Sequence, residues 1–153
     1  MEEQLIETWQ IHNRIQIYVI RALSAEQFAA AAGKGKSVAQ QFAHVHNVRL
    51  MWLKASAPTL LDRVSKLDTA GELAAESLIT AFEASGEAIE TVVREALAAG
   101  TKVKGFKPST PAFVGYFISH ESYHLGKVDM TLRQCGCPMD DKTHYGIWEW
   151  GSR

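Results

Sequence analysis

Four long segments of the chain space their apolar residues as amphipathic helices do, and no segment shows the sustained alternation of a strand. The first covers residues 3–23. The second begins at Ser37, which forms a capping-box pattern with Gln40, and reaches residue 54 or 55. A third, rich in alanine, is expected to open at Thr69, with Glu72 completing a second capping box, and to stop at Gly100.

The fourth segment carries the clearest boundary signals. Thr110 is expected as the N-cap and Pro111 as the first helical residue, and Gly136 with Pro138 closes the helix. Four long helices joined by short or moderate connections predict an all-α fold, a four-helix bundle. The ending "GIWEW" is too aromatic for a free tail, so Ile147, Trp148 and Trp150 are expected to dock it onto the bundle.

The size and charge of the chain narrow the function classes. A length of 153 residues predicts a single domain spanning 1–153, and a net charge of −1 leaves no concentrated basic stripe for nucleic acid. The acidic start lacks the features of a signal peptide, and no run approaches the roughly 18 apolar residues of a membrane span. Cys135 and Cys137 are too close to staple a fold, so a cytoplasmic protein is expected.

The stretch "ISHESYHLG" places two histidines on one face of the fourth helix. His120 and His124 are four residues apart, about one helical turn, in a sector that also holds Phe113 and Phe117. That sector is expected to face the bundle interior. A single histidine there would more often be a hydrogen-bonded core residue, but two on one turn can share one cation.

The same stretch also matches H-E-x-x-H, the zinc motif in which the glutamate acts as general base. In this interpretation Glu121 would activate water for a metalloprotease or another hydrolase. The protease alternative is a minority one, because the chain lacks the strands that would bind a peptide substrate.

A third ligand is expected from the second helix, in "FAHVHNVRLMWL". His44 and His46 point about 200° apart on a regular helix, so one metal cannot easily take both. The His46 side is the more apolar and could equally be the core. The His44 side is slightly favoured, because Gln40 and Asn47 on that side could hydrogen-bond to the ligands.

Other residues point less clearly to a site. His12 lies near Trp9 and His144 lies in the tail, and packing or surface roles are favoured for both. The basic stretch "KVKGFK" is expected to be a solvated loop, although an anionic substrate could use it. Apolar residues around His46, including Phe42 and Leu53, leave room for a homodimer face.

Together, "SVAQQFAHVHNVRLMWL" and "HESYHLGKVDMTLRQCG" resemble the DinB/YfiT-like superfamily of bacterial proteins over essentially the whole chain. Its pattern has a histidine about eight residues before an aromatic in helix two, then H-x-x-x-H in helix four. His44, eight residues before Trp52, takes the first position, and His120 and His124 take the others.

The resemblance implies a bundle that binds a divalent metal, usually zinc or nickel, through these three histidines. Some members are thiol-dependent transferases or isomerases that use a low-molecular-weight thiol, which would make this chain a metal-dependent enzyme activating a thiol or water. The alternative is a non-catalytic bundle that binds a metal or a small molecule. Tyr123, Leu125 and Lys127 depart from the family pattern and bear on the choice of thiol or substrate, and Tyr123 is a candidate substrate contact.

Overall fold

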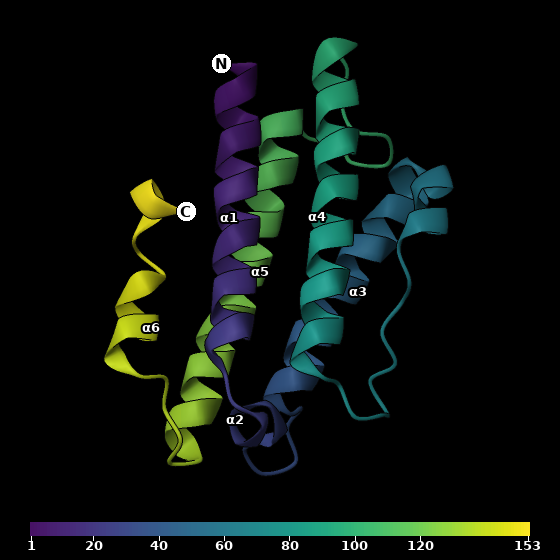
Figure 1. Ribbon diagram of the computed structural model, residues 1–153. Helices are drawn as coiled ribbons and strands as arrows, with labels where there is room; N and C mark the ends of the chain where they lie inside the picture. The colour runs from purple at the N-terminus through teal and green to yellow at the C-terminus, as the bar shows by residue number, and fades with distance from the viewer.

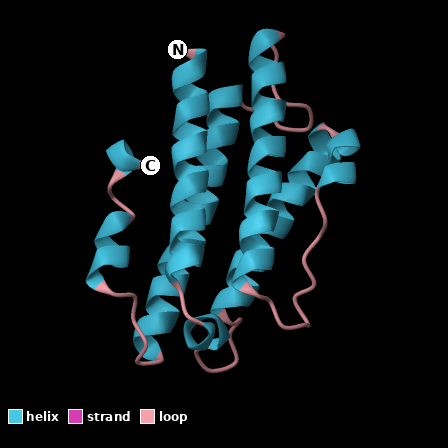
Figure 2. Cartoon of the chain, viewed as in Figure 1, coloured by secondary structure: helices cyan, strands magenta, loops and turns pink.

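The computed structural model describes residues 1–153, and all of its regular elements are helical (Figures 1 and 2). Four long helices, α1, α3, α4 and α5, run side by side as a bundle, which confirms the predicted fold class. The elements in chain order are α1 (Glu2–Ala22), α2 (Ala25–Ala29), α3 (Val38–Ser56), the 3₁₀ helix η1 (Pro58–Arg63), α4 (Ala75–Ala98), α5 (Thr110–Gln134), α6 (Asp141–Gly146) and η2 (Trp150–Ser152). None of the helices combines the length and apolar character needed to cross a bilayer.

The N-terminus of α3 is capped as the sequence predicts. The Ser37 hydroxyl accepts a hydrogen bond from the Gln40 backbone N–H, and the Gln40 side chain accepts one from the Ser37 N–H. The same reciprocal box, made by Ser24 and Gln27, starts the short helix α2, which the sequence analysis did not predict. Capping boxes therefore fix the N-terminal ends of both α2 and α3.

Two predicted helix starts are wrong. The N-cap expected at Thr69 lies five residues later, at Ala74, because the Thr69 carbonyl instead accepts a hydrogen bond from the Gln40 side chain on α3. The preceding segment is thereby held against α3 as a loop. The N-cap of α5 is Ser109 rather than Thr110, whose hydroxyl donates to the Thr101 carbonyl.

Glycines end the two longest helices. Gly100 after α4 and Gly136 after α5 have φ angles of 62° and 74°, the left-handed region that residues with a Cβ rarely adopt. The next N–H after each glycine reaches back to the last turn, from Thr101 to the Ala96 carbonyl and from Cys137 to the Leu132 carbonyl. Both ends are thus Schellman motifs, which satisfy otherwise unpaired carbonyls.

A buried polar layer divides the core into two apolar clusters. One cluster includes Phe28, Phe42 and Phe82, and the other includes Phe113 and Phe117. The layer between them gathers side chains from all four long helices: His12 and Asn13 from α1, His46 and Arg49 from α3, Ser85 from α4 and Glu121 from α5.

The apolar face proposed for a homodimer lies inside the bundle. Phe42 is 1% exposed and Leu53 is fully buried. These side chains pack in the two core clusters, so they offer no surface to a second copy. The helical pattern identified an apolar face correctly, but that face is the core.

The C-terminal tail docks onto α1, as the sequence predicts. The Tyr18 hydroxyl donates to the Lys142 carbonyl, and the Arg153 guanidinium lies 3.8 Å from the centre of the Tyr18 ring. Ile147 packs against the core, whereas Trp148 is 73% exposed. The tail, which runs beside α1 (Figure 1), is therefore held by polar and cation–π contacts as well as by apolar ones.

Candidate metal centre

Three histidines converge between α3 and α5. His44 projects from α3, and His120 and His124 project from successive turns of α5. One nitrogen from each ring lies within 4.8 Å of the other two, close enough for one cation to reach all three. The ring centroids are 4.7 Å apart for His44 and His124 and for His120 and His124. The structure thus brings together the three residues that the sequence singled out.

The chemistry of these rings suits a cation. The Nδ1 atoms of His120 and His124 are buried and have no hydrogen-bond partner. Burying a polar atom in this way costs free energy, and a bound ligand can offset that cost. Partial burial, reinforced by the nearby charge of Lys36, lowers the pKa of His44. Burial and the neighbouring histidines lower the pKa of His124 to about 4. The imidazoles are therefore neutral at neutral pH, which is the form that binds metal.

The triad lies at the edge of the core rather than in its middle. All three histidines are half-buried, whereas Glu121 and Leu125, the next residues along α5, point into the bundle. The sector that α5 buries keeps Phe113 and Phe117 from the expected one but is rotated by about half a residue, roughly 50°, so that it is centred away from His120 and His124. As a result one side of the triad stays open, as catalytic metal sites require.

The side chains expected to support the ligands have other partners. Gln40 caps α3 and holds Thr69, and Asn47 pairs with both the N–H and the carbonyl of Leu67. Neither amide is hydrogen-bonded to a histidine, so their positions on the His44 side reflect anchoring of the loop before α4. Tyr123 does lie beside the triad, with its ring centroid 5.3 Å from that of His124.

His46 faces the opposite way from His44 and belongs to the polar layer. It is fully buried, its Nδ1 is 3.2 Å from the Ser85 hydroxyl and its Nε2 is 2.8 Å from the Ser65 carbonyl. Both ring nitrogens are occupied by the protein. His46 is therefore a satisfied core histidine, the outcome that the 200° separation left open.

Glu121 is not placed to act as a general base beside the triad. Its carboxylate is fully buried and accepts two hydrogen bonds from Arg49, both of 2.7 Å, while His12 Nε2 lies 2.9 Å away. Burial alone would raise the pKa of Glu121, but the charge and hydrogen bonds of Arg49, helped by His12, lower it to about 2. A carboxylate so fully engaged serves the fold, so the "HESYH" match does not describe a protease-type site.

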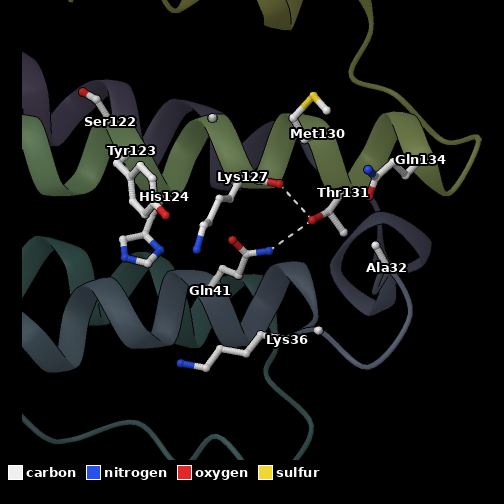
Figure 3. Close-up of a pocket in the computed structure, with 12 residues that line it drawn as sticks. Ala32, Lys36, Gln41, Ser122, Tyr123, His124, Lys127, Met130, Thr131 and Gln134 are labelled. Atoms are coloured by element: carbon white, nitrogen blue, oxygen red, sulfur yellow. Dashed lines mark hydrogen bonds between the residues drawn. The ribbon is translucent and has the colours of Figure 1, made fainter.

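A cavity of about 830 Å³ opens next to His124 (Figure 3). Lys36 and Lys127, both exposed, reach over it, and the Lys127 ammonium lies 4.6 Å from the centre of the Tyr123 ring. On its floor, the Gln41 amide donates to the Thr131 hydroxyl, and its own oxygen is buried without a partner. The sequence analysis did not select Gln41, although its position three residues before His44 puts it on the same face of α3.

The model of the DinB family matches residues 1–148, nearly the whole chain. The chain belongs to the DinB family. No match was found among the curated proteins or among the solved structures.

Family membership and geometry point to the same place in this DinB-family protein. The cluster His44, His120 and His124 could hold a divalent metal ion through three neutral nitrogen donors, and one side of the cluster stays open. Imidazole nitrogens bind zinc, nickel, copper and iron, so the type of donor does not identify the metal.

Proposed function

We propose that this DinB-family protein binds one divalent cation, zinc or nickel, through His44, His120 and His124, and uses it to activate a thiol or a water molecule for transfer to a small electrophile. The observation that carries the proposal is the convergence of three neutral, half-buried imidazoles within 4.8 Å at the edge of an open cavity. A cation held in such a site supplies Lewis acidity, which makes a thiol or water a better nucleophile near neutral pH.

The residues of the chain prepare the site before any substrate arrives. Two of the three histidines come from one rigid helix, and α3 supplies the third from an adjacent helix, so the donors are held with little freedom. Tyr116 stacks on His120 with an interplanar angle of 9°, which limits rotation of that ring. Such support lowers the entropic cost of binding and orienting reactants.

The cavity beside His124 supports a small, negatively charged reactant. Lys36 and Lys127 are the charged groups that line it, and no carboxylate does. A carboxylate or similar anion on the substrate or thiol can therefore be attracted by both lysines while its reacting atom lies near the histidines. The free oxygen of Gln41 adds an acceptor for an N–H or O–H group of the same molecule.

The proposal is tested by thiol transfer with defined reactants. The protein is stripped by chelation, reloaded with zinc or nickel, and mixed with glutathione and 1-chloro-2,4-dinitrobenzene, so that the carbon–sulfur bond formed replaces the carbon–chlorine bond and chloride leaves. We expect turnover that depends on the added metal and is lost in His124→Ala. A water nucleophile is tested in parallel by hydrolysis of a chromogenic ester under the same metal conditions.

Metal binding and catalysis are separated by the same experiment. Stoichiometric metal without any metal-dependent transfer or hydrolysis would favour the non-catalytic alternative, a bundle that holds a metal or a small molecule. Absence of metal binding would remove the metal-dependent enzyme and the metal-holding bundle, and would leave only the small-molecule-binding bundle. His144→Gln is the matched control, because it alters a half-buried histidine outside the triad.

A further inference from the structure

A second, smaller cavity lies on the other side of α5, between α1, α5 and the C-terminal tail. Its volume is about 260 Å³, and five of the eleven residues that line it are apolar: Ile15, Leu125, Ile147, Trp148 and Trp150. It contains none of the three triad histidines. Figure 1 shows the tail running beside α1 and α5, which explains how a hollow can form there.

The tail that closes this cavity is firmly positioned. Arg153 lies over the Tyr18 ring and its carbonyl accepts a hydrogen bond from Arg14, while the Tyr18 hydroxyl holds the Lys142 carbonyl. Gly146 packs so closely on Tyr18 that a Cβ there would collide with the tyrosine hydroxyl. The cavity wall is therefore a built part of the fold rather than a chance gap.

Three buried polar atoms that make no hydrogen bond belong to residues lining this cavity. Gln16 is 1% exposed, and its Nε2 is buried with no hydrogen-bond partner. Asp129 Oδ1 and His144 Nδ1 are also buried and make no hydrogen bond, although they lie 3.8 Å apart, within ion-pair distance of each other. The molecule has eight such side-chain atoms, and three of them belong to residues that line this one small cavity. Unsatisfied buried groups of this kind call for a ligand or for ordered water.

Water alone fills this space poorly. Most of its wall is apolar, so water molecules there find few protein groups to hydrogen-bond with. A flat ring would instead pack against the indoles, which favour aromatic partners. The chemistry of the polar atoms then sets what the ring must carry.

The free groups select a neutral molecule with a donor and an acceptor side by side. The Gln16 amide offers both an N–H and a carbonyl oxygen, and rotation can exchange their places. Asp129 Oδ1 adds an acceptor, while the negative charge of Asp129 is already matched by Arg133, whose Nε lies 3.0 Å from Oδ2. A charged ligand has no unpaired counter-ion here, so a carboxamide or a lactam is the best match.

We propose that the cavity between α1, α5 and the tail is a second binding site, separate from the histidine triad, for a neutral single-ring molecule of the carboxamide or lactam type. Its ring packs against Trp148 and Trp150, and its amide group pairs with the Gln16 side chain. The site does not require a metal, so its test does not depend on whether the proposed function is correct.

The test uses benzamide and 2-pyridone as probes, with toluene as the apolar comparison, on the full chain kept metal-free with EDTA. Binding is followed by tryptophan fluorescence and by ligand-observed NMR. Gln16→Leu removes the free amide with little change in volume. The matched control is Gln41→Leu, because Gln41 is a buried glutamine that lines the cavity beside the triad.

We expect at least one of the two amide probes to bind at a single site, about threefold to tenfold more weakly in Gln16→Leu, as loss of a hydrogen bond implies, and unchanged in Gln41→Leu. Trp148→Ala, at a position that is 73% exposed, should also weaken binding, and it serves as the second variant if Gln16→Leu does not fold. Equal binding of toluene and the amide probes, weakening by Gln41→Leu alone, or no binding of either amide probe would overturn the proposal.

Discussion

Replacing Glu121 with glutamine tests the buried polar layer at the point where the charges meet. Arg49 and Glu121 are both fully buried, and the carboxylate accepts from Arg49 Nε and Nη2 at 2.7 Å each. In Glu121→Gln the side chain keeps its shape, but its NH₂ group faces an N–H donor of Arg49 and cannot accept a hydrogen bond from it. The guanidinium also loses its counter-charge. Removing one partner of a buried ion pair typically costs about 3–5 kcal/mol, because the other charge stays buried.

The expected loss is measurable by standard unfolding methods. In a domain of this length, 1 kcal/mol lowers the Tm by roughly 2–4 °C, so Glu121→Gln should lower it by roughly 6–20 °C. Thermal unfolding by circular dichroism and urea unfolding at pH 7 provide the measurement. Glu95→Gln, at an exposed position on α4, is the matched control and should change stability by less than about 0.5 kcal/mol.

The acid dependence of stability follows from the same pair. Because Arg49 and His12 lower the folded-state pKa of Glu121 to about 2, below its ordinary value of 4.5, the pair stabilises the fold above about pH 4.5. This contribution is lost as the pH falls from about 4.5 towards 2. Between these values the wild type should therefore lose more stability than Glu121→Gln does.

A double variant separates the pair from the packing around it. Arg49→Met with Glu121→Leu removes both charges and keeps apolar volume, so it should recover most of the stability lost in Glu121→Gln. The reasoning is refuted if Glu121→Gln costs less than about 1 kcal/mol. It is also refuted if the double variant loses as much stability as the sum of the losses in Arg49→Met and Glu121→Leu made singly.

Three further predictions concern packing and charge. Gly86→Ala should destabilise the protein by about 1–2 kcal/mol in urea unfolding, because a Cβ there collides with Asn13, which Arg49 holds in place. A gain in stability of about 1 kcal/mol, as helix propensity alone predicts, would count against the close packing. Lys127→Met should raise the KM for glutathione several-fold but not that for cysteamine, and an equal rise for both thiols would argue against an anion site. Gly146→Ala should displace the Tyr18 ring and speed hydrogen exchange in the C-terminal tail alone, and unchanged exchange there would contradict the docking described.

Local sequence patterns were sufficient to predict much of the fold and the histidine cluster. Helical periodicity and caps placed the four long helices, and the four-residue spacing of His120 and His124 put them on one face. The 200° separation of His44 and His46 correctly implied that only one could join them. These features depend on neighbours in the sequence, which is why they could be predicted.

The features that were missed depend on contacts between distant residues. Glu121 is paired with Arg49, 72 residues earlier in the chain, and no local pattern distinguishes a catalytic glutamate from a buried structural one. Gln40 and Asn47 shared the His44 side of α3, but the loop before α4 engages their amides. The late start of α4 has the same cause. Sequence spacing fixes direction around one helix, whereas tertiary packing decides what lies opposite.

The most direct test of the central claim is the metal content of the purified protein, measured by mass spectrometry before and after reconstitution with zinc or nickel. The wild type is compared with His44→Ala, His120→Ala and His124→Ala, and His46→Gln serves as the control because both nitrogens of His46 are bonded within the core. We predict about one ion per chain, lost in each triad variant and kept in the control. Failure of the wild type to bind either metal, or retention in the triad variants, would contradict a three-histidine metal centre.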